Sequence, residues 1–176
     1  AYRRLFKKKS WRVFVSCFRE CHDMWNVLGN PLMLSMATYL YQRSDIVPQN
    51  SAQLIRDYVF ALTETWDSAR GVQRHYDKEF TPERARNALG RLAYHCMSEG
   101  RHTFTVDDAS NWLDLHHLQG SPINYLRRLC EITGLLYASH DDSWAFSHKI
   151  IMDYFVANHV VDRAEGVQSL FSQRGQ

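Results

Sequence analysis

The chain has 176 residues, 45% of them hydrophobic, and its formal net charge at pH 7 is +2. That length and hydrophobic content allow one ordinary domain, or two small ones, with a packed core. Because 21 basic residues are nearly balanced by 19 acidic ones, the overall charge argues against a general attraction to nucleic acid or to a membrane surface.

No apolar run reaches the roughly 18 to 20 residues that a membrane span needs, and the first residues do not follow a signal-peptide pattern. We therefore expect a cytoplasmic protein with no membrane contact. The four cysteines lie within apolar helical patterns, which favours reduced thiols over a disulfide framework. The sequence already has helical character at its start, so we expect it to be part of a longer protein.

The first third of the sequence predicts a helical bundle. Apolar residues at helical spacing form one face between Trp11 and Gly29. Asn30 is a favourable N-cap and Pro31 suits the first position of a helix, so a second helix is expected to end near Arg43. After a loop, Ser51 is expected to cap a third amphipathic helix that reaches about residue 69.

From Thr81 onward, the predicted elements follow the order of a winged helix. Thr81 is followed by proline and glutamate, which predicts the start of a helix that closes at Gly100. A short β-prone run at His102–Thr105 comes next. Two further helices are expected to begin near Asp107 and Ser121.

A hairpin and a last helix complete the order. Two β-prone runs, Leu135–Ser139 and Trp144–Phe146, flank a polar turn. Ser147 is expected to cap the helix Ile150–Val161, whose apolar residues cover most of its circumference and predict burial on several sides. His148 falls in its first turn, where unpaired backbone N–H groups and the helix dipole favour an anion.

The sequence therefore predicts a mostly α fold, with a small helical bundle followed by a winged-helix domain that carries a short β-hairpin wing. The expected boundaries are residues 1–69 for the helical domain and 70–80 for a linker. Residues 81–163 form the winged-helix domain, and residues 164–176 form a tail or the start of another domain.

Catalytic and metal-binding motifs give little signal. Cys17, Cys21 and His22 share a region of one helix and raise the possibility of a zinc site, but the spacing supplies no fourth ligand. Cysteines on an apolar stripe are more often small buried hydrophobes, so we expect no metal. The sequence contains no Gly-rich phosphate-binding loop, nucleophile elbow or metalloprotease motif. We therefore assign no catalytic residue to this chain.

A winged helix also raises DNA binding, because the second helix of a helix-turn-helix enters the major groove. The corresponding helix here offers Asn124, Arg127 and Arg128. The turn of the wing is acidic at Asp141 and Asp142, where a wing that contacts DNA would carry basic residues. Nucleic-acid binding is therefore the alternative interpretation, not the main one.

Two motifs, in order, resemble a known family. Asn30–Leu34 reads NPLML, and Phe146–Ala157 reads FSHKIIMDYFVA. Together they resemble the C-terminal half of a NACHT-type NTPase of the STAND class, which is related to Nod-like receptors. Gly100–Thr105 also resembles the first winged-helix strand of that family, and the resemblance extends from about Trp11 to Val161.

The resemblance implies a regulatory role in an ATPase whose catalytic loop lies upstream of this chain. Pro31 would contact the adenine side of bound ADP or ATP, and His148 would reach the β-phosphate from the winged helix. The partners implied are the protein's own nucleotide-binding domain and, on activation, further copies of the parent protein. Lys149 and Ile150 are larger or more charged than is usual in the family, and Asp153 replaces a common glutamate.

Three interpretations stay open at this level. The chain is a nucleotide-sensing lid of a NACHT-like ATPase, a DNA-binding winged helix, or a helical protein-interaction module. Pro31 is equally explained as an ordinary helix-starting proline, and His148 as a core or capping residue. The basic residues near the N-terminus are a solvated helix face or, in the first interpretation, the junction with the nucleotide-binding core; they are Arg3, Arg4, Lys7, Lys8, Lys9 and Arg12.

Overall fold

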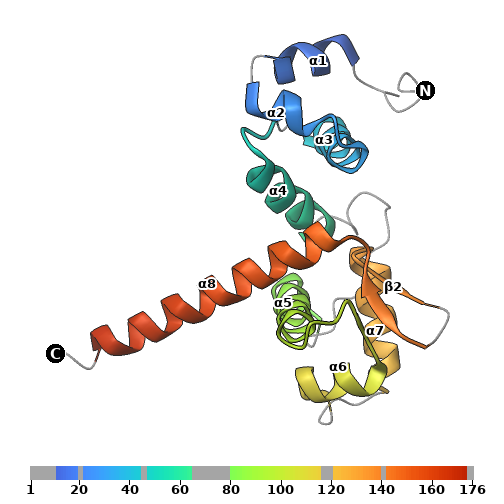
Figure 1. The fold of residues 1–176 in the computed structure, drawn as a ribbon, viewed down its shortest axis with the longest axis vertical. Helices are drawn as coiled ribbons and strands as arrows, with labels where there is room; N and C mark the ends of the chain where they lie inside the picture. The colour runs from blue at the N-terminus through green and yellow to red at the C-terminus, as the bar shows by residue number, and fades with distance from the viewer. Residues whose placement is uncertain are drawn as a thin grey trace. The chain divides into compact units, whose positions relative to one another are not determined.

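The computed structural model describes residues 11–19, 22–44, 47–64, 80–115, 121–139 and 142–173. Within these ranges the chain is mostly helical, with eight helices and a small three-stranded antiparallel sheet near the C-terminus, as the sequence predicts (Figure 1). The chain divides into two compact units, Ala1–Thr65 and Trp66–Gln176. No helix in the described ranges is both long enough and apolar enough to span a membrane.

The first unit contains four helices around an apolar core. They are α1 (Trp11–Arg19), α2 (His22–Val27), α3 (Pro31–Ser44) and α4 (Ser51–Glu64). Side chains with almost no solvent exposure come from all four helices: Phe18, Met24, Met36, Leu40, Leu54 and Val59. Burial of this apolar surface is the main favourable contribution to the stability of the unit.

Two helix starts in the first unit are fixed by asparagine side chains. The Leu32 backbone N–H donates to Asn30 Oδ1 at 2.9 Å, which confirms Asn30 as the N-cap of α3. The Gln53 N–H donates to Asn50 Oδ1 at 2.8 Å, so Asn50 caps α4. The prediction that Ser51 is the cap is therefore wrong by one residue, because the adjacent asparagine is an equally good capping residue.

The second unit has the element order of a winged helix. Its helices are α5 (Pro82–Ser98), α6 (Val106–Leu113), α7 (Pro122–Thr133) and α8 (Lys149–Gln173), and its strands are β1 (Thr103–Phe104), β2 (Leu136–Ala138) and β3 (Trp144–Phe146). The fully buried residues at its centre include Leu89, Leu92, Phe104, Leu126, Leu129 and Ile151.

The strands form a sheet in the order β1-β3-β2, with both neighbouring pairs antiparallel. Ala145 of β3 lies opposite Thr103 of β1 on one side and Tyr137 of β2 on the other. The predicted hairpin and the predicted short strand therefore join in one sheet. The three residues of β3 are all buried, as expected for the central strand.

Local sequence signals define the ends of several helices in this unit. The Arg84 N–H donates to Thr81 Oγ1 at 3.2 Å, which confirms the predicted start of α5. Thr105 and Asp108 form a capping box at α6, in which each side chain accepts a hydrogen bond from the other residue's backbone N–H. Gly134 ends α7 with a φ of 64°, a left-handed conformation that glycine adopts without strain.

Helix α8 differs from the prediction in length and in burial. It extends from Lys149 to Gln173, and Figure 1 shows that it crosses α5 and continues past it. Ile151 and Phe155 near its start are buried, but Val160 and Val161 are about half exposed. The prediction of burial on several sides is therefore wrong for these two valines, because α8 packs on α5 through one face, to which the neighbouring His159 belongs, and leaves both valines exposed.

The predicted linker, residues 70–80, lies outside the described residues except for Phe80. That residue is buried, and its ring centroid lies 5.2 Å from that of Tyr125. The guanidinium of Arg128 lies over the same ring, 5.2 Å from its centroid. Phe80 is thus packed into the second unit, while the predicted domain ends at residues 69 and 163 stay predictions.

Candidate functional site

Pro31 and His148, the two site residues predicted from the sequence, belong to different units. Pro31 is the first residue of α3 and is exposed to solvent. Proline suits this position because the first backbone N–H groups of a helix have no partner within the helix. The conformation of α3 therefore accounts for Pro31 as a helix-starting residue, and its exposed ring is also accessible to a ligand.

An apolar hollow of about 360 Å³ adjoins the start of α3. Residues just before and just after Pro31, among them Gly29 and Leu34, form part of its wall. Trp11 of α1 and Trp25 of α2 also line it, and they remain 41% and 43% exposed. The first unit thus presents accessible indole rings around a concave apolar surface, the usual character of a small-molecule pocket.

His148 immediately precedes α8 and is exposed. Its Nδ1 accepts a hydrogen bond from the Ile150 backbone N–H at 3.2 Å, and its carbonyl accepts one from the Ile151 N–H at 3.0 Å. His148 is therefore the N-cap of α8. The prediction that Ser147 performs this role is wrong, because α8 begins at Lys149, two residues after Ser147.

The cap has a consequence for the imidazole ring of His148. Since Nδ1 accepts a hydrogen bond, the neutral ring carries its proton on Nε2. Nε2 is then a hydrogen-bond donor on an exposed side chain at the positive end of a helix dipole. This arrangement suits an anionic ligand that approaches the start of α8.

Residues on both sides of His148 pack or pair with one another within the motif. Phe146 and Phe155 are both buried, and their ring centroids lie 6.1 Å apart, so the two ends of the motif pack against one another. Lys149 Nζ lies 2.7 Å from Asp153 Oδ1, one helical turn further on. Two residues that depart from the family pattern are thus partners of each other, and neither takes part in the His148 cap.

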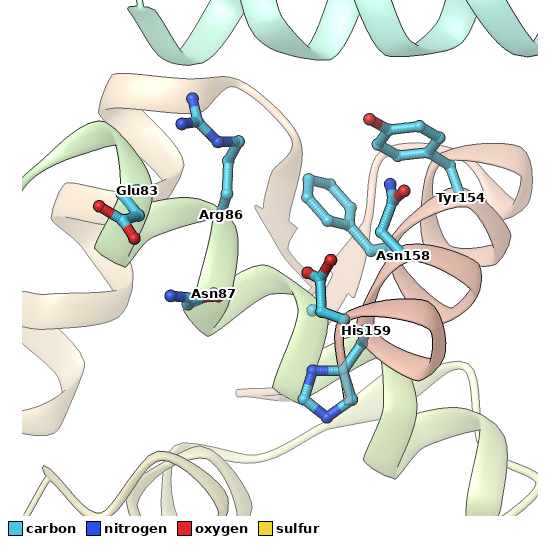
Figure 2. Close-up of a pocket in the computed structure, with 9 residues that line it drawn as sticks. Glu83, Arg86, Asn87, Tyr154, Asn158 and His159 are labelled. Atoms are coloured by element: carbon cyan, nitrogen blue, oxygen red, sulfur yellow. The ribbon is translucent and has the colours of Figure 1, made fainter. Parts of the chain in front are cut away.

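A polar groove of about 260 Å³ lies between α5 and α8 within the second unit. Figure 2 shows Glu83, Arg86 and Asn87 of α5 on one side of it and Tyr154, Asn158 and His159 of α8 on the other. Gly90 and Phe155 also line the groove. Both are buried, so the charged and amide groups surround a small apolar floor.

Sequence reasoning missed this groove. Its two sides are about 70 residues apart in sequence, and no local motif connects them. Gly90 is the one local signal, because glycine within a helical pattern often marks a close approach of two elements. A methyl group on Gly90 would lie 3.5 Å from both Cβ and Nδ1 of His159, which is ordinary van der Waals contact.

The predicted DNA-reading helix, α7, has mixed surroundings. Asn124 and Arg127 are exposed, whereas Arg128 lies over the Phe80 ring. Asp142, in the turn of the wing, has a left-handed φ of 53° and is exposed, while Asp141 lies outside the described residues. The described surface of α7 therefore offers fewer accessible basic groups than its sequence suggests.

The cysteines and the possible zinc site are described only in part. Cys17, Cys96 and Cys130 are free thiols, and Cys21 lies outside the described residues, as does the side chain of His22. Burial raises the pKa of the Cys96 thiol to about 11. Among the described side chains, no group of three His, Cys, Asp or Glu residues is arranged to hold a metal ion.

Comparison with known proteins returned no match to any family model, to any curated protein or to any solved structure. The functional interpretation therefore depends on the residues and geometry of this chain and on the motif resemblance noted above.

Proposed function

We propose that this chain is the regulatory part of a NACHT-type STAND ATPase. In this proposal it closes over bound ADP or ATP and couples the state of the nucleotide to domain opening and oligomerisation. An upstream nucleotide-binding domain holds most of the nucleotide and carries out hydrolysis. The observation that carries the proposal is His148, an exposed N-cap whose Nδ1 is engaged by the backbone and whose Nε2 can donate.

The chemistry at the start of α8 suits a diphosphate. The imidazole Nε2–H supplies a directed hydrogen-bond donor, and the helix dipole adds positive potential at the same end. A hydrogen bond to a charged group contributes about 1.5–3 kcal/mol, which is enough to decide whether a nucleotide stays bound. His148 is therefore the residue through which the winged helix contacts the β-phosphate.

The first unit has an exposed apolar surface that suits the adenine base of a nucleotide. Pro31 is exposed, and the apolar hollow formed by its sequence neighbours carries accessible tryptophan rings. A planar adenine ring is suited to contacts of this kind. In the proposal, Pro31 contacts the adenine side of the nucleotide, while hydrophilic contacts to the phosphates come from the second unit and the upstream domain.

In the proposal, the state of the nucleotide sets the equilibrium between a closed and an open form of the parent protein. ADP favours the closed form, because it binds that form more tightly than the open one. Exchange for ATP changes the contact at His148 and releases the winged helix from the nucleotide. The opened parent protein then exposes surfaces for assembly with further copies of itself.

The parent protein supplies the first test. Its gene should encode Gly-x-x-x-x-Gly-Lys-Ser/Thr upstream of this chain, since that loop cradles the phosphates. The purified full-length protein should release adenine nucleotide, mainly ADP, on denaturation, as measured by anion-exchange chromatography. A parent that lacks this motif, or that contains no nucleotide, contradicts the proposal.

Each of the two alternative functions, DNA binding and protein interaction, has its own test. A DNA-binding winged helix is supported if this chain binds duplex DNA with an affinity that falls steeply as salt rises. An interaction module is supported if full-length His148→Ala retains both the nucleotide content and the activity of the wild type. In either case His148 is only the cap of α8.

A further inference from the structure

Two histidines take part in the packing around α5, His159 from α8 and His95 from α5 itself, and both rings contact Tyr94 of α5. His159 of α8 lies against Gly90, and its ring centroid is 5.2 Å from that of Tyr94 on α5. His95 of α5 stacks on Trp112 of α6, with centroids 5.1 Å apart and ring planes 8° from parallel. Both histidines are only partly exposed. The two imidazoles thus take part in the packing of α8 and α6 onto α5.

Two arginines place positive charge near both histidine rings. Arg91 of α5 and Arg163 of α8 act electrostatically on His95 and on His159. Both arginines are exposed and make further contacts beside the histidines: the Arg91 guanidinium donates to the Leu113 carbonyl at 3.4 Å, and Arg163 lies over the Tyr94 ring, 5.9 Å from its centroid.

Acidic groups oppose the arginines, and each of them acts on only one of the two histidines. Glu99 of α5 raises the pKa of His95, and Asp162 of α8 raises that of His159, while His95 lowers the pKa of His159. Arg101 lies over Trp112, the ring on which His95 stacks, at 5.1 Å. Glu83 and Arg86 of α5 line the groove beside His159 and carry opposite charges.

The balance of these effects favours neutral imidazoles. Burial is the largest cause that lowers the pKa of His95, and Arg91 and Arg163 add to it against the opposing effect of Glu99. Burial likewise lowers the pKa of His159, assisted by Arg163, Arg91 and His95. Each histidine therefore binds a proton less readily in the folded protein than at its ordinary value of 6.5.

We propose that the α5–α8 contact is a proton-sensitive latch: it holds α8 on α5 while His159, in the contact, and His95, on the other side of Tyr94, are neutral, and it loosens when they are protonated in mild acid. Protonation places up to two further positive charges beside Arg91 and Arg163 in a partly desolvated contact. Separation of α8 from α5 returns the charged rings to water.

The direction of the pH dependence follows from linkage. Because folding lowers the pKa of both groups, an opened contact binds more protons than a closed one, and acid favours opening. The stabilising contribution is complete above pH 6.5 and is lost as the pH falls below that value through the lower pKa of the folded state. The inference concerns the second unit alone and stands whether or not the chain binds a nucleotide.

Hydrogen exchange of the 176-residue chain tests the latch. Protection of the α8 amides near residues 156–163 is compared at pH 7.5 and pH 5.5, after correction for the intrinsic dependence of exchange on pH. In the wild type, the protection factors of these amides should be lower at pH 5.5 than at pH 7.5. The decrease should be up to about tenfold for each pH unit by which folding lowers the pKa of a histidine. The double variant His95→Gln, His159→Gln should show no such fall, and the matched control His102→Gln, which alters an exposed histidine outside this contact, should behave as the wild type.

A second measurement covers the case in which the double variant does not fold. The imidazole Cε1–H resonances of the wild type are assigned and followed from pH 8 to pH 4.5. Midpoints below 6.5 for His95 and His159, with loss of α8 protection over the same range, support the latch. Midpoints at or above 6.5, or α8 protection that is unchanged while both rings titrate, overturn it.

Discussion

The two units of this protein differ in the kinds of contact that pack the helices within each of them. In the first unit, Tyr39 of α3 meets Tyr58 of α4 edge to face at 5.5 Å, and Phe14 of α1 meets Tyr41 of α3 at 5.3 Å. The second unit also has aromatic contacts, such as Phe146 with Phe155, but titratable groups take part in its helix packing as well, through the His95 and His159 contacts. Aromatic and aliphatic contacts do not change with protonation in mild acid, so we expect the proposed latch to make the second unit more sensitive to acid than the described part of the first.

The largest effects should come from matched substitutions in the two cores. Leu40 of α3 and Leu129 of α7 are both 0% exposed. Leu40→Ala and Leu129→Ala should each lower the free energy of unfolding by about 2–5 kcal/mol, because each leaves a cavity in a packed core. Urea titration followed by hydrogen exchange should assign each loss to the unit that carries the substitution. An equal loss of protection in both units would show that they unfold together and would remove the basis for comparing them.

Helix caps should produce the next largest effects. Asn30→Ala removes the acceptor for Leu32 N–H in the first unit, and Thr105→Ala removes the acceptor for Asp108 N–H, at 3.1 Å, in the second. Each should cost about 0.5–2 kcal/mol, as measured by chemical denaturation. Asn30→Asp and Thr105→Ser keep a capping oxygen and should retain most of the stability. Equal losses in the alanine and the conservative variants would contradict the capping role.

The caps also illustrate how much of this structure could be predicted from sequence. The winged-helix order was predictable because its signals are local: Thr81 at a helix start, Gly134 at a helix end, and β-prone runs on both sides of a polar turn. Two caps were misplaced by one residue, at Asn50 and His148, because neighbouring residues could each perform the role. The corrected position of His148 is informative, since capping through Nδ1 fixes which ring nitrogen can donate to a ligand.

Features that depend on distant residues could not be predicted in this way. The groove between α5 and α8 combines Asn87 with Asn158, and no periodic pattern links those two positions. The exposure of Val160 and Val161 likewise depends on which face of α8 packs against α5, not on the apolar character of its sequence. Local sequence therefore identified helices and strands, while tertiary packing decided which helix faces meet.

The Asp108 carboxyl gives the second unit another dependence of stability on pH, in a more acidic range than the histidines. Burial alone would raise the pKa of the Asp108 carboxyl, but hydrogen bonds from Thr105 and Arg101 outweigh it and lower that pKa below 3.8. The resulting stabilisation is present above pH 3.8 and is lost as the pH falls through the folded value.

Asp108→Asn should therefore reduce the dependence of stability on pH below about 4, an expectation set by the ordinary aspartate pKa. The effect should be modest because Asp108 is partly exposed to solvent, which screens its charge. Thermal unfolding between pH 2.5 and pH 5 measures it, with the exposed neighbour variant Asp107→Asn as control. Identical slopes for wild type and Asp108→Asn would exclude the proposed contribution.

Gly90→Ala should have the smallest effect on stability. The added methyl group meets His159 at 3.5 Å, an ordinary contact, and alanine is favoured over glycine within a helix by about 0.5–1 kcal/mol. We expect unchanged or slightly higher stability in chemical denaturation, with the same α8 protection at pH 7.5. A loss greater than 1 kcal/mol would mean that α8 requires the missing side chain at Gly90 in order to dock.

The dissociation rate of ADP from the full-length parent protein tests the central claim most directly. His148→Asn keeps a side-chain oxygen that can accept the Ile150 N–H, but it replaces the imidazole Nε2–H with a shorter amide that does not reach as far, so it weakens the nucleotide contact while it keeps the helix cap. We expect roughly 10- to 150-fold weaker retention of ADP, corresponding to a lost hydrogen bond to a charged group, with thermal stability of the nucleotide-free protein unchanged. His102→Asn serves as the control. An ADP dissociation rate in His148→Asn equal to that of the wild type would contradict the assignment of His148 as the nucleotide contact of the winged helix.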